Sequence, residues 1–204
     1  GYFPIKDIKV RLDLDNVSEE KDGKLFYEIE IENKKTLYEI SKVDNRYRPL
    51  SGAKLRLSEK DSKKIIKDWI SDGKAHELRG LEVGVSYILE ELEPVDGYLK
   101  AKDQEILIKT EKDKGLDLVN EPIKTRIIKL DEKTDKPLKN VVFNLEDNQG
   151  EPLKFNLEEG VYSRDDEGEE KLVTDSKGEI VLETLETGKF YLVEKSPNQY
   201  YDNI

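Results

Sequence analysis

The sequence contains no cysteine and no methionine among its 204 residues. Without cysteine the chain can form neither a disulfide nor a thiolate metal site. Methionine is missing at position 1 as well, so we expect a mature or excised piece of a longer protein. His76 is the only histidine, which excludes a metal site built from several histidines, and we interpret it as a strand residue beside a turn.

Long apolar runs and an excess of positive charge are missing too. No stretch approaches the roughly 18–20 apolar residues of a membrane span, and no signal peptide is present. The net charge of −11 argues against a nucleic-acid partner, whose backbone requires a basic surface. Hydrophobic residues make up 35% of the sequence and charged residues 40%. This hydrophobic content is low for one large core but adequate for small sandwiches of about 80–90 residues.

No motif for a metal, a cofactor or external catalysis stands out. The acidic residues Asp13 and Asp15, and the segment 163–170, lack the ligand order of an EF-hand, so we interpret them as a solvated strand face and a loop. No glycine-rich phosphate loop and no nucleophile elbow occurs. Trp69 is assigned to packing at a strand edge rather than to ligand stacking. We therefore expect no cofactor, no metal and no enzyme in the ordinary sense.

What the chain does contain is a series of short alternating runs separated by turn residues such as Ser71-Asp72-Gly73 and Asp96-Gly97. This pattern is typical of an all-β sandwich. The central part predicts strands near 37–43, 53–58, 68–70, 76–79, 86–91, 105–110 and 116–120.

Three of these runs carry one polar residue on the face that is otherwise apolar, because successive strand residues point to opposite faces. The three faces are Tyr38, Ile40 and Lys42; Tyr87, Leu89 and Glu91; and Leu116, Leu118 and Asn120. An unpaired buried charge is so costly that Lys42, Glu91 and Asn120 should be neutralised, paired or chemically joined.

The same pattern recurs along the chain. Lys129 lies 87 positions after Lys42, and Asn120 lies 87 positions after Asn33. Phe190, Leu192 and Glu194 repeat the face that ends in Glu91, and Tyr27, Ile29, Ile31 and Asn33 repeat the face that ends in Asn120. We interpret the chain as a tandem array of one β-domain, read out of phase.

The positions at which this repeat begins and ends divide the chain into three segments. Residues 1–35 match only the last strands of a preceding unit, since Gly1-Tyr2 matches Gly97-Tyr98. Residues 36–123 form a complete unit, and residues 124–204 form a unit that lacks its last strands. Either the ends are arbitrary cut points in a longer array, or residues 1–35 complete the third unit by strand addition, within the chain or between chains.

The ordered motifs of the central unit resemble those of the Cna B-type (SpaA-type, prealbumin-like) domain of Gram-positive surface adhesins and pilins. They lie at 40–44 (Ile-Ser-Lys-Val-Asp), 49–53, 80–91 and 96–98. The resemblance covers 36–123 well and 124–204 more loosely. It departs from the family pattern at Pro94, which is three residues before Gly97 rather than two, and in the third unit, which has no Asp-Gly. The resemblance implies tandem Greek-key β-sandwiches, Ig-like or prealbumin-like.

The resemblance also implies a self-formed isopeptide bond between Lys42 and Asn120, assisted by Glu91. Desolvation would make the lysine a neutral nucleophile, and burial would favour a protonated Glu91 that polarises the Asn120 carbonyl and carries a proton to the leaving ammonia. The alternative is an unreacted Lys–Glu ion pair beside a hydrogen-bonded asparagine. In the third unit Lys129 and Glu194 are present without a downstream Asn, so Asn33 is the candidate for that bond.

Two functions stay open. One is a structural stalk of an extracellular protein anchored to the cell wall, with neighbouring repeat domains as partners. The other is an adhesin module that binds a host or matrix ligand through the third unit. That unit has about 16 more residues between its Lys and Glu than the central one (65 against 49), and we expect them to form an inserted loop near 153–171.

Overall fold

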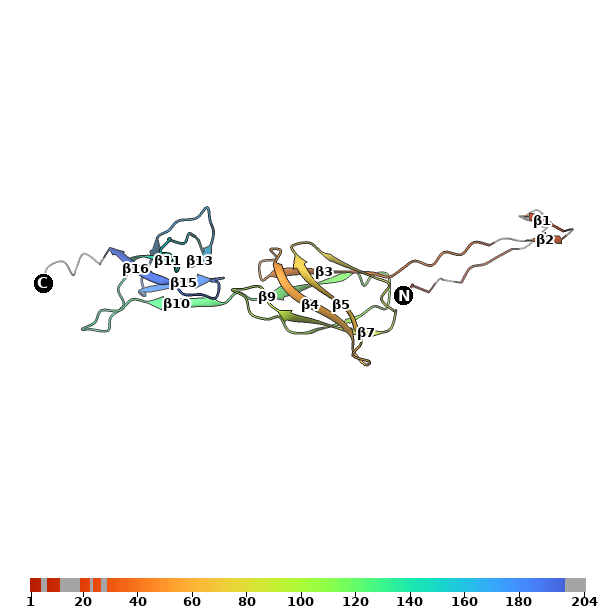
Figure 1. Ribbon diagram of the computed structural model, residues 1–204, viewed down its shortest axis with the longest axis horizontal. Helices are drawn as coiled ribbons and strands as arrows, with labels where there is room; N and C mark the ends of the chain where they lie inside the picture. The colour runs from red at the N-terminus through yellow and green to blue at the C-terminus, as the bar shows by residue number, and fades with distance from the viewer. Residues whose placement is uncertain (5–6, 12–18, 23, 27–28, 197–204) are drawn as a thin grey trace.

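The computed structural model describes residues 1–4, 7–11, 19–22, 24–26 and 29–196. It consists of an N-terminal arm (residues 1–35) and two β-sandwiches, which follow one another along the long axis of the molecule (Figure 1). The first sandwich contains β3–β9 and the second contains β10–β16. The described residues include no helix. The prediction of an all-β chain of tandem sandwiches is confirmed.

The first sandwich consists of two facing sheets. One has the order β6-β3-β9 and the other the order β5-β4-β7-β8. The strands are β3 (Leu37–Asp44), β4 (Ser51–Glu59), β5 (Ile65–Asp72), β6 (His76–Arg79), β7 (Ser86–Glu93), β8 (Gln104–Leu107) and β9 (Gly115–Asn120).

Alternation along the strands creates the core between these sheets. Leu55 and Leu57 on β4 and Leu89 on β7 are fully buried, while the residues between them face outward. Each such leucine contributes about 1.5–3 kcal/mol through the apolar surface it removes from water. Turns separate the strands, as at Gly73, whose φ of 81° suits glycine and allows the sharp reversal between β5 and β6.

The second sandwich also has two sheets, ordered β10-β15-β13-β12 and β14-β11-β16. Its strands are β10 (Lys124–Ile128), β11 (Val142–Glu146), β12 (Phe155–Glu158), β13 (Val161–Arg164), β14 (Leu172–Val173), β15 (Glu179–Glu183) and β16 (Tyr191–Ser196).

The two sandwiches share one pairing scheme. In the first, β4 pairs with β7 so that Leu55 lies opposite Glu91, with a register shift just before Leu55. In the second, β11 pairs with β16 so that Phe143 lies opposite Glu194, with the same shift just before Phe143. In the first sandwich β3, which contains Lys42, pairs antiparallel with β6; in the second, β10, which ends just before Lys129, pairs antiparallel with β15.

The extra residues of the second sandwich do not form the loop that we expected near 153–171. Residues 155–164 form a hairpin, β12–β13, whose second strand pairs in parallel with β15 and so widens one sheet. The loop prediction is therefore wrong for this part. Only the connection from β13 to β14 is irregular, apart from isolated bridges. The hairpin is favoured because Phe155 and Tyr162 on its two strands are buried against the core.

The arm contains two extended segments that run antiparallel, joined by a bridge between Tyr2 and Lys35. Farther out it includes a short hairpin of β1 (Glu19–Lys21) and β2 (Lys24–Phe26). We predicted a strand over 27–33, but residues 29–34 are not in a strand, and 27–28 lie outside the described residues. Alternation defines a strand only where a sheet edge is available to pair with it, and no strand among the described residues pairs with 29–34.

The junction between the sandwiches is held by specific contacts. Arg46 of the first pairs with Glu183 of the second at 2.5 Å, and Glu183 is buried. Asp96 accepts hydrogen bonds from the backbone N–H and the hydroxyl of Thr187. The position beside it must be glycine, because a Cβ on Gly97 would lie 2.9 Å from the Thr184 backbone.

Candidate functional site

The first sandwich brings Lys42, Glu91 and Asn120 together. Lys42 lies on β3 and Asn120 at the end of β9, and these strands pair in parallel with Lys42 opposite Leu118. Asn120 therefore lies two residues beyond Leu118 on the same face of the sheet. The long side chain of Lys42 can lean along the strand direction toward it. Glu91 reaches the pair from β7 in the facing sheet.

All three side chains are buried, with exposed fractions of 3% for Lys42, 1% for Glu91 and 0% for Asn120. The Lys42 amine (Nζ) lies 3.5 Å from Oε1 of Glu91 and donates a hydrogen bond to the Leu118 carbonyl at 2.8 Å. The Asn120 amide nitrogen donates to Oε2 of Glu91 at 2.9 Å and to the Leu99 carbonyl at 2.6 Å.

Backbone groups fix the position of the carboxyl group. The N–H of Ala101 donates to Oε2 of Glu91 at 2.6 Å, the same oxygen that accepts from Asn120. The segment after Tyr98 thus supplies one donor to Glu91 and one acceptor, the Leu99 carbonyl, to Asn120. Our sequence reasoning missed these groups, since a backbone N–H or C=O leaves no signature in the residue type.

Burial away from water lowers the pKa of Lys42 below its ordinary value, because a charged ammonium loses its hydration there. The negative charge and hydrogen bonding of Glu91 act in the opposite direction but do not cancel the effect of burial. The site therefore favours the neutral amine more than water does. Only a neutral amine has the lone pair that nucleophilic attack requires.

Oδ1 of Asn120 accepts no hydrogen bond among the described residues, and Oε1 of Glu91 has only the Lys42 amine nearby, at 3.5 Å. A buried acceptor without a donor costs about 1–3 kcal/mol. A proton placed on Glu91 would supply a donor inside the site. The arrangement can therefore hold an amine, an amide and a carboxyl group that exchanges protons between them.

The second sandwich places only two of its three predicted residues together. The Lys129 amine lies 3.0 Å from Oε2 of Glu194, and both side chains are about one third exposed (32% and 31%). Asn33 is exposed and lies in the arm, which is on the other side of the first sandwich from the second sandwich (Figure 1). Within one chain the structure does not bring Asn33 to this pair.

The remaining candidates have structural surroundings. His76 begins β6, and its ring stacks on that of Trp69 on β5 with centroids 4.6 Å apart, so the two rings cover each other between the edge strands of the two sheets. Asp13 and Asp15 lie outside the described residues. No cluster of three or more His, Asp or Glu side chains in the described ranges could hold a metal. Those ranges contain no helix of the length and apolar character needed to span a membrane.

The aspartate that follows each lysine by two residues organises a turn. Asp44 is buried and accepts hydrogen bonds from the N–H groups of Arg46 and Arg48 and from the Arg48 side chain. Burial alone raises the pKa of Asp44, but these hydrogen bonds and the Arg48 charge lower it below its ordinary value. Asp131 accepts in the same way from Lys133 and Thr134. The repeated Lys-x-Asp thus orients the chain after each lysine strand.

A protein-family model, the SpaA prealbumin-like fold domain, matches the chain twice, over residues 36–122 and 123–203. The chain belongs to this family. Both matches include a lysine strand and its glutamate, Lys42 with Glu91 and Lys129 with Glu194. The comparison with curated proteins found no match.

Several solved structures are similar to this SpaA-family chain at low sequence identity. The shaft pilin SpaA from Lactobacillus rhamnosus GG is 15% identical, with a TM-score of 0.39, covering 83% of this chain and 90% of the pilin. The Bacillus anthracis TIE protein is 24% identical, with a TM-score of 0.46, covering 80% and 28%. A streptococcal ancillary pilin is 19% identical, with a TM-score of 0.38, covering 93% and 67%.

Proposed function

We propose that this SpaA-family chain is a structural stalk segment of a Gram-positive surface adhesin or pilin, outside the cell and anchored to the cell wall. An isopeptide bond between Lys42 and Asn120 stabilises it. One observation carries the proposal: Glu91 contacts both the Lys42 amine and the Asn120 amide nitrogen inside a closed core. A carboxyl group so placed touches the group that must lose a proton and the group that must gain one.

The reaction needs no cofactor and no external substrate. Neutral Lys42 attacks the Asn120 side-chain carbonyl carbon while protonated Glu91 stabilises the oxygen that becomes negative. Glu91 then moves a proton from the lysine nitrogen to the asparagine nitrogen. The C–N bond to that nitrogen breaks, ammonia leaves, and a secondary amide remains. The fold replaces substrate binding, because both reactants are held in one core. Each molecule reacts once, so the chain is not an enzyme.

The intact mass tests this bond. We expect the wild-type chain to weigh one ammonia less than its sequence, whereas Glu91→Ala and the better-matched Glu91→Gln should show the full mass. Digestion of the wild type should give a branched peptide that joins Lys42 to Asn120.

The matched control is Glu90→Ala, which removes the neighbouring carboxylate on the outer face of β7, paired with Lys100 at 3.5 Å. This variant should keep the mass deficit. A wild-type chain of full mass would refute the bond, and so would a Glu91→Gln variant that still lost ammonia.

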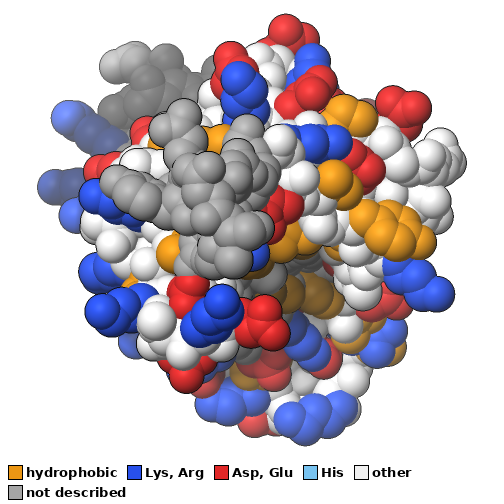
Figure 2. Space-filling view, turned by 90° about the vertical axis from the view of Figure 1, so that its left-hand side faces the viewer, with side chains coloured by type: hydrophobic (Ala, Val, Ile, Leu, Met, Phe, Trp, Pro, Cys, Tyr) orange, Lys and Arg blue, Asp and Glu red, His pale blue; other side chains and the backbone are white. Residues whose placement is uncertain are grey.

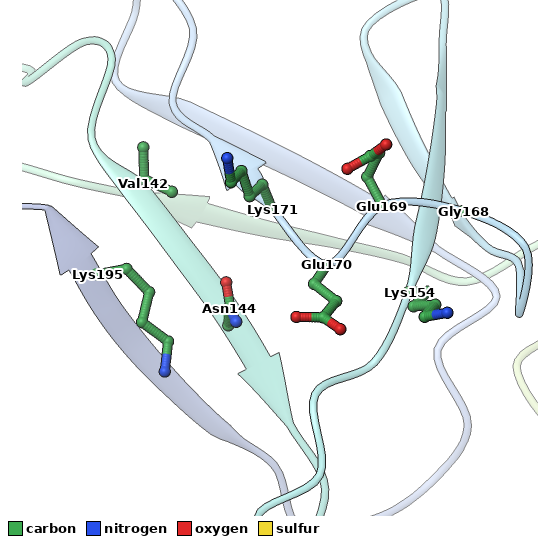
Figure 3. A pocket seen from close by; sticks show the side chains of 8 residues that line it. All are labelled: Val142, Asn144, Lys154, Gly168, Glu169, Glu170, Lys171 and Lys195. Carbon is green, nitrogen blue, oxygen red and sulfur yellow. The ribbon is translucent and has the colours of Figure 1, made fainter.

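A second candidate function, ligand binding by the second sandwich, rests on a pocket of about 420 Å³ beside the inserted hairpin. Lys195 of β16, Lys154 before β12 and Lys171 before β14 line it together with Asn144, Glu169 and Glu170 (Figure 3). The loop that carries Glu169 is fixed to Phe155 by two backbone hydrogen bonds, of 2.8 and 2.9 Å. Lys195 already pairs with Glu146 at 3.0 Å, so Lys154 and Lys171 are the lysines that we expect to meet an acidic group of a host or matrix ligand.

A glycan array that includes sulfated and carboxylated sugars tests this second function. We expect the wild-type chain to bind acidic glycans with an affinity that falls with salt, and Lys154→Glu/Lys171→Glu to bind them at least tenfold more weakly. Lys60→Glu, a change on the first sandwich, should leave binding unchanged. Equal loss in both variants would mean that only net charge matters, and this result would exclude the pocket.

A further inference from the structure

We propose that the junction between the two sandwiches makes the stability of the second depend on the first. Arg46 of the first sandwich supplies the counter-charge for Glu183, a carboxylate buried in the second. The second sandwich therefore reaches its full stability only when it is docked on the first, and it docks in one orientation. This inference goes beyond the stalk function, and it depends neither on the bond in the first sandwich nor on ligand binding by the second.

Glu183 is a charged residue in an unusual place. It ends β15, and its side chain is only 1% exposed. At the opposite end of the second sandwich, lysine, arginine, aspartate and glutamate side chains lie at the surface, where water solvates them (Figure 2). A buried carboxylate has lost that hydration, so it requires hydrogen bonds and a cation from the protein.

The second sandwich provides only part of this requirement. The Ser163 hydroxyl on β13 donates to Oε1 of Glu183 at 2.6 Å. Lys124 lies opposite Glu183 on β10, but among the described residues Arg46 is the only cation that forms an ion pair with this carboxylate. The Arg46 guanidinium donates to the same oxygen at 2.5 Å. The cation therefore comes from the first sandwich.

The partners of Glu183 keep it ionised. Burial alone raises the pKa of Glu183. Hydrogen bonds from Ser163 and Arg46, together with the Arg46 charge, act in the other direction and leave the pKa below its ordinary value. Glu183 is therefore charged at neutral pH. Without Arg46 that charge would stay buried with a hydroxyl group as its nearest partner, an arrangement that strongly destabilises a fold.

The first sandwich holds Arg46 in place for this contact. Arg46 lies in the turn after β3, where the Asp44 carboxylate accepts hydrogen bonds from the backbone N–H groups of Arg46 and Arg48, at 2.8 and 2.9 Å. The N–H of Tyr47 donates to the Asp44 carbonyl at 3.0 Å. Because the turn is fixed by its own contacts, less conformational freedom is lost when the Arg46 side chain meets Glu183.

A second segment of the first sandwich reaches the same short stretch of the second, residues 183–187. The Asp96 carboxylate accepts from the Thr187 N–H at 3.1 Å and from the Thr187 hydroxyl at 2.6 Å. Gly97 lies so close to Thr184 that a Cβ on the glycine would be 2.9 Å from the threonine backbone. Rotation about the connection between the sandwiches would break these contacts together with the ion pair, so the junction favours a single orientation.

The single tryptophan of the chain, Trp69 on β5, makes a selective test possible. Tryptophan fluorescence follows the thermal unfolding of the first sandwich, whereas calorimetry detects both sandwiches. We expect Arg46→Ala to lower the melting temperature of the second sandwich by at least about 10 °C, although the substituted residue lies in the first. The fluorescence transition should be nearly unchanged, because Arg46 is on the surface of the first sandwich.

Two further variants separate this effect from ordinary surface damage. Arg79→Ala removes another arginine of the first sandwich, one that pairs with the exposed Glu77, and it should move neither transition. In Glu183→Gln the buried charge is gone. Adding Arg46→Ala to this variant should therefore lower the melting temperature of the second sandwich much less than it does in the wild type. Equal losses in the two backgrounds would overturn the proposal.

Distances between two spin labels test the fixed orientation. Because the chain has no native cysteine, Asp61→Cys/Ser176→Cys carries one label on an exposed residue of each sandwich. The distance distribution should be narrow in this variant and clearly broader when Arg46→Ala is added. A broad distribution without Arg46→Ala, or an Arg46→Ala variant that melts like the wild type, would overturn the proposal. The ammonia deficit of the same samples reports separately on the bond in the first sandwich, so the two proposals can fail independently.

Discussion

Replacing Lys42 with alanine should lower the stability of the first sandwich by about 4–5 kcal/mol, the largest thermodynamic effect that we expect from any single substitution in this chain. The proposed bond joins residues 42 and 120 and so closes a loop of 79 residues. By analogy with a disulfide that closes a loop of this length, the cross-link is worth about 4.5 kcal/mol through the entropy it removes from the unfolded chain. The melting temperature should fall by roughly 20–30 °C.

Two comparisons separate this effect from ordinary core damage. Asn120→Ala should cost about as much as Lys42→Ala, and the double variant little more than either, because the same covalent link is lost in each case. Lys54→Ala, which removes a surface ion pair between Lys54 and Glu93, should cost less than about 1 kcal/mol. Additive losses in the double variant, or an unchanged melting curve for Lys42→Ala, would show that no cross-link contributes.

The sequence was informative about this site because burial restricts residue types so strongly. Alternation alone placed Lys42, Glu91 and Asn120 on inward faces, and in the structure all three are buried within one core. Their side-chain contacts could be anticipated, since three polar groups in one apolar space must satisfy one another. The backbone partners at Leu99, Ala101 and Leu118 could not, because every residue type has the same N–H and C=O groups.

The predictions failed where a segment depends on its neighbours more than on its own pattern. Ile29 and Ile31 alternate as strand residues do, yet residues 29–34 pair with no strand among the described residues. The extra segment of the second sandwich was expected to form a loop because of its length. It forms a hairpin instead, in which Phe155 and Tyr162 are buried against the core. Length and composition do not decide between a loop and a hairpin when an open edge such as that of β15 is within reach.

A second large effect should be mechanical. When the chain is pulled by its two ends, tension enters the first sandwich along β3 and leaves along β9, which lie side by side in parallel. A Lys42–Asn120 bond joins these strands directly, so the tension crosses the bond and residues 43–119 carry none. We expect the first sandwich of the wild type to give no unfolding step, even at forces that unfold the second.

In Lys42→Ala the same pull has to shear β3 from β9. The first sandwich should then unfold and release about 270 Å of chain, since 79 residues extend by at most roughly 3.3–3.6 Å each. The second sandwich serves as the internal standard, because Lys129 and Asn33 are not joined within one molecule and its step should appear in both proteins. Single-molecule force measurements on wild type and variant make the comparison. A step of about 270 Å in the wild type would mean that β3 and β9 are not linked, and it would remove the physical basis for a stalk that resists extension.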